Sequence, residues 1–358
     1  MHSARHSNLA RFLLAAYVLL VAYASLYPLS GWREPGAPLL AFLVAPWPRY
    51  VTAFDLAANF LGYVPFGMLC ALALYPRETA GRAVLAAFLT GTALSLALET
   101  AQGYLPARIP SNVDVLANVA GAVAGGVAGA RMARWLLEAG PLRRLRGAAL
   151  EPGAAADLGL TLLGLWLFAQ LNPETLLFGT GDLRDLVTGA ANRPHGAEIF
   201  VFIEATTAAA NLAAVALLAS AVARPGAPLR RLLGLLLGAV LVVKTFSMAV
   251  LMHAQNVLSW LTPGGQFGLA AGIALAAALL ALPRLARLAL AAVLLMAATV
   301  LVNLAPPNPY LAATLKVWEQ GHFLNFNGLT RLVGTLWPFA ALGYLIYLAS
   351  AASRQAVR

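Results

Sequence analysis

Ten long apolar runs constrain the fold of this chain more than any other feature. Each is roughly 18 to 25 residues long, the length that an α-helix needs to cross a hydrocarbon layer about 30 Å thick. The runs are rich in alanine and leucine and do not alternate with polar residues, which disfavours a membrane β-barrel. They cover, to within a few residues, 12–29, 56–75, 83–104, 113–136, 158–178, 197–222, 232–252, 266–282, 286–304 and 332–350.

The composition agrees with lipid, rather than water, as the solvent around these runs. Hydrophobic residues make up 61% of the chain and charged residues only 11%, whereas about 25% of an ordinary soluble domain is charged. We therefore predict an all-α fold, a polytopic integral membrane helix bundle of about ten transmembrane helices.

The lysines and arginines predict the orientation of the bundle. The two termini and the even-numbered loops hold 16 of the 24, the other loops hold 7, and Lys244 lies inside a run. Since the positive side of a membrane protein faces the cytoplasm, both termini are predicted to be cytoplasmic. The formal net charge of +10 does not indicate a nucleic-acid partner, because these charges occupy short loops between apolar runs.

A basic segment divides the chain. Residues 138–157 carry Arg143, Arg144 and Arg146 among glycine, proline and alanine, as expected for a cytoplasmic linker that contacts anionic lipid. We therefore predict a four-helix membrane unit over 1–137 and a six-helix membrane unit over 158–358.

A repeated sequence motif lies at the predicted outer ends of two runs. Asp55 and Asn59 open one run and Asp114 and Asn118 open another, both within the pattern D-x-x-A-N-x-x-G. Positions i, i+4 and i+7 of a helix share one face. Each helix is therefore expected to present a carboxylate, an amide and a glycine on one stripe, and the two helices are expected to run parallel.

The run between them ends with a third polar stripe. Ser95, Glu99 and Gln102 follow the same spacing, and Arg108 lies in the next connection. Ionisable groups in membrane helices usually face the bundle interior and find partners there. We expect Glu99 and the two aspartates to converge on Arg108 and the amides, forming a polar site near the outer face.

Helix capping and close packing provide an alternative explanation for part of this pattern. Asp55 fits a helix N-cap, and Ser111 with Asp114 fits a capping box. The stripe of Gly121, Gly125 and Gly129 is typical of helices that pack closely, and the asparagines are suited to hydrogen bonds between helices. Both interpretations stay open for these residues.

One acidic and one basic residue lie within later runs. Glu204 and Lys244 are expected at similar depth, roughly 10 Å below the outer surface at about 1.5 Å per helical residue. Opposite charges at matched depth predict a buried ion pair between neighbouring helices, which either fixes helix register or lines a polar cavity. Metal-ligand spacing is absent around the histidines, and neither a metal nor another cofactor is expected.

Residues 10–135 resemble the VanZ-like family of bacterial membrane proteins. The resemblance rests on Asp55, Asn59, Pro65 and Gly67, on Ser95, Glu99 and Gln102, and on Arg108, Ser111, Asp114, Asn118 and Gly121, in this order and spacing. The family's namesake is associated with resistance to the glycopeptide teicoplanin. The resemblance therefore implies a multi-pass protein of the bacterial cytoplasmic (inner) membrane with a cell-envelope role, and it implies no defined reaction.

Three functions remain as hypotheses. The first is a non-enzymatic envelope protein whose partners are membrane lipids and a lipid-linked precursor or glycopeptide bound at the outer polar cluster. The second is a transporter or flippase, although the two halves show no inverted repeat. The third is a membrane-embedded acid–base enzyme acting on an envelope lipid. The sequence contains no recognisable phosphate loop or activated nucleophile, so an enzyme is less expected than a binding protein.

Overall fold

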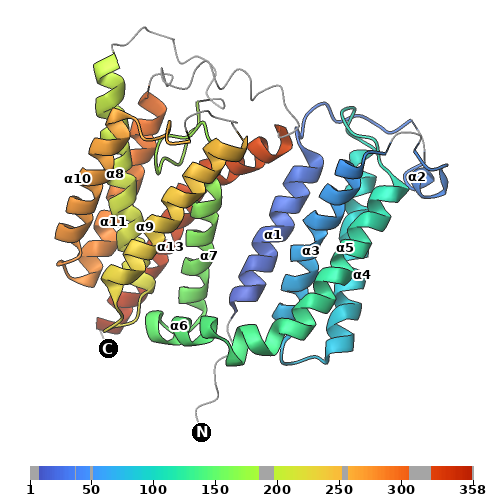
Figure 1. The fold of residues 1–358 in the computed structure, drawn as a ribbon, viewed down its shortest axis with the longest axis horizontal. Helices are drawn as coiled ribbons and strands as arrows, with labels where there is room; N and C mark the ends of the chain where they lie inside the picture. The colour runs from blue at the N-terminus through green and yellow to red at the C-terminus, as the bar shows by residue number, and fades with distance from the viewer. Residues whose placement is uncertain are drawn as a thin grey trace. The chain divides into compact units, whose positions relative to one another are not determined.

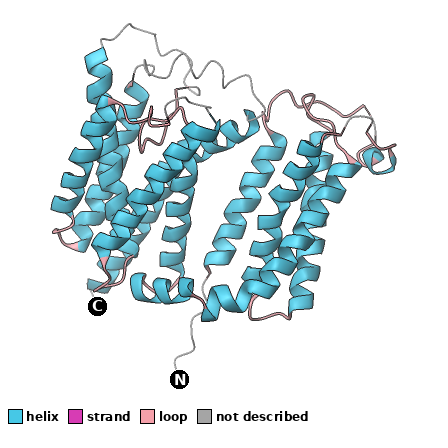
Figure 2. Cartoon of the chain, in the orientation of Figure 1, coloured by secondary structure: helices cyan, strands magenta, loops and turns pink. Residues whose placement is uncertain are grey.

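The protein is built from α-helices. The structure, a computed structural model, describes residues 8–36, 38–48, 51–184, 197–251, 257–305 and 324–356. These residues contain no strand (Figure 2), and their only bridge pairs Leu150 with Ala223. The predicted all-α helical bundle is confirmed.

Ten helices coincide with the ten predicted apolar runs. Eight of them, among the described residues, are long and apolar enough to cross a membrane, some with a π-helical last turn. They are α1 (Leu9–Leu26), α3 (Ala53–Leu74), α4 (Ala80–Gln102), α5 (Asn112–Arg134), α8 (Ala197–Val222), α9 (Leu229–Phe246), α11 (Arg284–Leu304) and α13 (Leu324–Ala356). The π-helical turns, Trp135–Ala139 and Ser247–Leu251, follow α5 and α9. On which side the termini lie stays a prediction.

The other two apolar helices are shorter. Helix α7 covers Ala154–Ala169 and α10 covers Pro263–Leu279. The sequence predicted a helix over 158–178, but the helix ends at Ala169 because Asn172 and Pro173 follow within one turn. At about 1.5 Å per residue, 16 residues extend about 24 Å. The apolar residues after Ala169 therefore form an irregular segment instead of the last turns of a helix.

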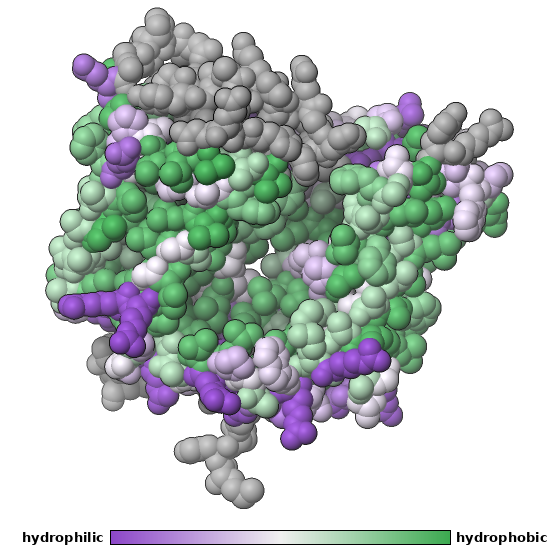
Figure 3. Space-filling view, in the orientation of Figure 1, coloured by the Kyte–Doolittle hydropathy of each residue, from purple (hydrophilic) through white to green (hydrophobic). Residues whose placement is uncertain are grey.

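Large apolar side chains face outward along the helices. Leu61 on α3 is 62% exposed and Leu235 on α9 is 71% exposed. Figure 3 shows hydrophobic side chains over the middle of the helices and hydrophilic ones gathered near their ends. A soluble monomer rarely exposes contiguous apolar area on this scale. The pattern fits helices whose middles face lipid.

The chain forms two compact units. Unit 1 comprises 1–148 with 152–157, and unit 2 comprises 149–151 with 158–358. Two short helices complete unit 1: α2 (Ala41–Val44) lies in the connection between α1 and α3, and α6 (Pro141–Ala149) lies within the basic segment that was predicted as a linker (Figure 1).

Helices α3 and α5 form the tightest contact of unit 1. A Cβ atom built at Gly121 or Gly125 collides with the backbone oxygen of Phe60 or Val64, and one at Gly129 lies 2.6 Å from the Met68 oxygen. The contacts advance by four residues on both helices, so the two helices run parallel, as predicted. Only glycine permits such a close approach of backbones.

Helix α8 is the most buried of the membrane-spanning helices of unit 2. Of the residues in its apolar 18-residue stretch, 67% are buried. Helix α10 packs on it through glycines of its own. A Cβ atom at Gly268 would lie 2.7 Å from the Ala205 oxygen, and one at Gly272 would lie 3.0 Å from Leu212. Both units therefore use glycine to bring one pair of helices into close contact.

The glycine contact between α3 and α5 predicts a stability difference between two alanine substitutions. Gly125→Ala places a methyl group against the Val64 backbone and should cost about 1–3 kcal/mol, the usual cost of overpacking. Gly62→Ala meets nothing within 4 Å and should leave stability near that of the wild type. Reversible unfolding of the purified protein in mixed micelles would measure both. Equal stabilities would show that the helices separate without cost.

Candidate functional site

Capping residues define the outer ends of α3 and α5, "outer" meaning the end that the arginine distribution predicts to lie outside the cytoplasm. Thr52 caps α3: its hydroxyl accepts from the Asp55 N–H at 3.1 Å and donates to Asp55 Oδ2 at 2.6 Å. The predicted N-cap role of Asp55 is therefore wrong, because Asp55 is the third helical residue of this capping box. Ser111 caps α5 and accepts from the Asp114 N–H, but the predicted capping box is incomplete, because the Ser111 N–H donates to Glu99.

Glu99 joins the end of α4 to the start of α5. Its side chain is buried, and Oε2 accepts a hydrogen bond from the Ser111 N–H at 2.8 Å. Among the described residues it forms no ion pair. The carboxylate thus satisfies a backbone donor at a helix N-terminus, where the helix dipole favours negative charge.

Two buried polar atoms beside Glu99 have no partner. The Asn118 amide donates to Ser95 Oγ at 3.0 Å, and both residues are buried. Among the described residues the Asn118 Oδ1 atom and the Tyr63 hydroxyl have no hydrogen-bond partner, although Tyr63 lies beside Ser95 and near Glu99. A buried polar atom without a partner costs about 1–3 kcal/mol. We call Tyr63, Ser95, Glu99 and Asn118 the polar core of unit 1.

Arg108 binds the end of α1, not the carboxylates. Its Nε donates to the Tyr27 carbonyl at 3.0 Å and its terminal nitrogen to the Ala24 carbonyl at 3.3 Å. Gln102 acts alike and donates to the Ser25 carbonyl at 3.0 Å. Of the predicted convergence of three carboxylates on Arg108 and the amides, the described residues contain no ion pair with Arg108, although Glu99 lies near enough to act on its charge. The last carbonyls of a helix have no partner within it, and their partial negative charge attracts a cation more strongly than a neutral donor.

Burial lowers the pKa of Arg108, and the nearby Glu99 carboxylate opposes this shift. An arginine nevertheless stays protonated at any physiological pH. The guanidinium is thus a fixed positive charge at the C-terminus of α1.

Two aspartates form an acidic edge next to the polar core. The Asp114 carboxylate lies beside the Asn59 amide and close to Asp55. The Asp55 side chain is exposed, and the side chains of Asn59 and Asp114 are half-buried. Neither aspartate forms an ion pair among the described residues. We call Asp55, Asn59 and Asp114 the acidic edge. The polar core and the acidic edge together contain six of the nine predicted polar-site residues, and the polar core also contains Tyr63.

Glu204 and Lys244 bind different partners in unit 2. Both are buried, but the described residues hold no ion pair between them. Glu204 accepts from the Thr262 hydroxyl at 2.6 Å. The Lys244 ammonium donates to the carbonyls of Asn172 and Thr175 at 2.8 and 2.9 Å. The predicted direct ion pair is therefore replaced by two separate sets of hydrogen bonds.

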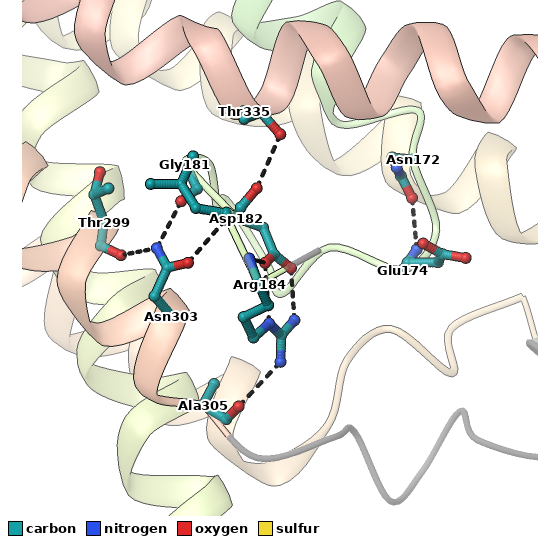
Figure 4. A network of polar contacts seen from close by, with 10 residues as sticks. Asn172, Glu174, Gly181, Asp182, Arg184, Thr299, Asn303, Ala305 and Thr335 are labelled. Carbon is teal, nitrogen blue, oxygen red and sulfur yellow. Dashed lines mark hydrogen bonds and ion pairs between the residues drawn. The ribbon is translucent and has the colours of Figure 1, made fainter. Parts of the chain in front are cut away.

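The irregular segment after α7 is bound along its length by neighbouring helices (Figure 4). The Asn303 amide of α11 donates to the Gly181 carbonyl at 2.7 Å, and Thr335 of α13 donates to the Asp182 carbonyl at 2.9 Å. Arg184 holds Asp182 in an ion pair at 2.6 Å and donates to the Ala305 carbonyl at 3.0 Å. Side chains of other helices thus provide hydrogen-bond partners for backbone groups of the irregular segment, which has no helical hydrogen bonds of its own.

The Asp182–Arg184 pair alters the titration of its carboxyl group. Burial raises the pKa of Asp182, but the hydrogen bonds and charge of Arg184 outweigh burial and hold the pKa below its ordinary value of 3.8. A carboxyl group with a lowered pKa stabilises the fold above its unfolded-state pKa, and this contribution is lost as the pH falls.

Several residues of these networks were not among the predicted site residues, and Tyr63, Asn172 and Thr262 are three of them. A single tyrosine in an apolar run belongs to no stripe of polar residues at helical spacing, so the sequence does not identify it as a site residue. Asn172 and Thr262 precede prolines and were identifiable only as helix boundaries. Their partners lie on other helices, so their roles depend on packing.

The fold and these polar networks define a multi-pass α-helical membrane protein. Residues 12–132 match the family model described as VanZ/LLP1, which confirms the resemblance over nearly the same residues. Comparisons with curated proteins and with solved structures gave no match. The polar core and the acidic edge lie wholly within the matched segment, and the helices of unit 2 lie beyond it.

The hydrogen bond between Glu99 and Ser111 predicts different effects of two substitutions. Glu99→Gln keeps an acceptor for the Ser111 N–H and should unfold near the wild-type midpoint. Glu99→Ala leaves this buried donor unpaired and should cost about 1–3 kcal/mol. Thermal unfolding in detergent would measure both, and an equal loss in the two variants would mean that the charge itself holds the helix ends together.

The Asp182–Arg184 pair predicts a pH-dependent difference between the wild type and Asp182→Asn. The wild type should be the more stable protein at neutral pH. The difference should shrink as the pH falls through 3.8 and disappear below the lowered pKa of Asp182 in the folded protein. Thermal unfolding midpoints measured across this range would test the sign. A difference that persists at the lowest pH would show that the ion pair does not cause it.

Proposed function

We propose that this chain is a VanZ-like protein of the bacterial cytoplasmic membrane with a cell-envelope role. In this proposal, unit 1 binds a lipid-linked or amphiphilic ligand near the outer face, and glycopeptide (teicoplanin) resistance is the phenotype to test first. The family match over 12–132 and the polar residues within that segment support it.

The observation that carries the proposal is the negative charge left at the outer end of unit 1. Arg108, the cation nearest to Glu99 along this end, is engaged by the carbonyls of α1. Asp55 and Asp114 lie close together without an ion pair among the described residues. Carboxylates accept hydrogen bonds and attract cations. The favoured ligand therefore offers amines or sugar hydroxyls, not phosphate alone.

The rest of the ligand is apolar because of where the acidic edge lies. Phe54 and Leu56, the residues on either side of Asp55, are 57% and 37% exposed and face lipid in the membrane. A ligand held there places its polar part on the carboxylates and its chain along these apolar side chains. Glycopeptides with acyl chains and lipid-linked envelope precursors both have this two-part structure.

Binding fits this arrangement better than acid–base catalysis. The buried carboxylate, Glu99, already accepts from the Ser111 N–H at 2.8 Å. The exposed carboxylate, Asp55, is held in a capping box with Thr52. Both groups are thus fixed by the helix ends that they stabilise, and a rigid acidic surface is suited to recognition.

The double substitution Asp55→Asn with Asp114→Asn tests this proposal. Asparagine keeps a side-chain acceptor for each helix start but removes both charges. Binding of teicoplanin to the purified full-length protein, measured by calorimetry, should weaken by about tenfold, as expected when two charge-assisted contacts become neutral. Resistance of the expressing cells should fall with it.

A matched control removes two charges elsewhere in unit 1. Glu78→Gln with Glu138→Gln changes one half-buried and one exposed residue near the opposite ends of α3, α4 and α5, and it should leave teicoplanin binding unchanged. If both double variants bind teicoplanin like the wild type while remaining folded, the acidic edge is not the site.

A further inference from the structure

Unit 2 contains an apolar cavity between three helices. It lies among α8, α9 and α10, which follow one another in the same unit (Figure 1), and has a volume of about 890 Å³. Its walls include Leu212 and Val215 of α8, Leu233 and Leu237 of α9, and Ile273 of α10. Trp166 of α7, which is fully buried, lines it as well.

Two arginines lie at one end of this cavity. Arg230 and Arg231 belong to its lining, occupy the first turn of α9 and are exposed. Neither side chain forms a hydrogen bond or an ion pair with the residues that the structure describes. The nearby arginines of α11 are engaged: Arg284 donates to the Ala221 carbonyl at 3.4 Å and Arg287 donates to Ser220 at 3.1 Å.

Glu151, whose backbone N–H donates to the Val222 carbonyl at 3.0 Å near this end, does not neutralise the pair. Among the described residues it forms no ion pair with either arginine, and it does not line the cavity. Arg230 and Arg231 therefore present two uncompensated positive charges beside an apolar space.

The depth of the cavity is close to that of one leaflet of a bilayer. Along α9 the lining runs from Leu229 to Leu237, eight residues later. At about 1.5 Å per residue this is about 12 Å, a little less than half of a hydrocarbon layer about 30 Å thick. The arginines thus lie at headgroup level when the apolar part lies at acyl-chain level.

We propose that this cavity binds an anionic phospholipid of the surrounding bilayer, with an acyl chain between α8, α9 and α10 and the phosphate held by Arg230 and Arg231. Arginine pairs with phosphate through charge-assisted, often bidentate, hydrogen bonds. The arginine end of α9 is also the end predicted to be cytoplasmic, where anionic lipids attract basic segments. This lipid site is independent of the ligand proposed for unit 1.

Two pairs of matched variants test the lipid site. Arg230→Gln with Arg231→Gln removes the phosphate contact; Arg143→Gln with Arg144→Gln removes two exposed charges from α6 in unit 1. Gly234 lines the cavity, and a Cβ atom there meets nothing within 4 Å, so Gly234→Leu fills the cavity. Gly238, four residues later, is equally open but does not line the cavity. Gly238→Leu is its control.

The measurement is native mass spectrometry of the full-length protein in detergent with added phosphatidylglycerol or phosphatidylcholine of identical acyl chains. The wild type should retain phosphatidylglycerol in preference. The Arg230/Arg231 variant should lose this preference by about tenfold or more, and Gly234→Leu should lose bound lipid. Both control variants should behave like the wild type.

Several outcomes would overturn the proposal. Equal retention of the two lipids by the wild type would mean that only ordinary boundary lipid is present. A preference that survives in the Arg230/Arg231 variant would place the headgroup elsewhere. Loss on Gly234→Leu without loss on the arginine variant would indicate an apolar occupant without an anionic headgroup.

Discussion

The close contact between α3 and α5 determines where the other features of unit 1 lie. Gly121, Gly125 and Gly129 let the two backbones touch, and the repeat of four residues on both helices fixes them as a parallel pair. Parallel helices that start at the same depth place their N-terminal residues side by side. The acidic edge exists because this contact brings Asp55 and Asp114 together although they are far apart in sequence.

The repeated sequence motif predicted that α3 and α5 run parallel, but it did not predict the surroundings of each of its residues. The pattern D-x-x-A-N-x-x-G repeats with a spacing of 59 residues, from Asp55 to Asp114. The backbone contacts pair Phe60 with Gly121, a spacing of 61. The matching residues are therefore displaced by two positions, and they have different surroundings: Asn118 is buried against Ser95, whereas Asn59 is half-buried beside Asp114. A repeated motif gave the direction and depth of both helices, whereas the roles of its members depended on packing.

Hydrophobic composition predicted where helices exist better than where they end. All ten runs coincide with helices because burying apolar side chains in lipid requires satisfied backbone groups, which a helix provides. Composition alone did not end α7, because residues 176–178 are as apolar as its core. The Asn172–Pro173 boundary signal decided the end, and the freed backbone groups found partners on α9, α11 and α13.

Arg108, which is half-buried, and Lys244, which is buried, bind carbonyl groups instead of carboxylates. A cation in a membrane helix was expected to pair with a carboxylate, but Arg108 binds carbonyls at the C-terminus of α1 and Lys244 binds carbonyls just beyond the C-terminus of α7. The carbonyls that Arg108 binds carry the negative end of the dipole of α1 and have no donor within that helix. The carbonyls that Lys244 binds belong to the irregular segment after α7, where no helix provides their donors. The carboxyl groups that were expected to neutralise these cations form no ion pair with them among the described residues, and Asp55 and Asp114 instead lie close to each other at the starts of α3 and α5.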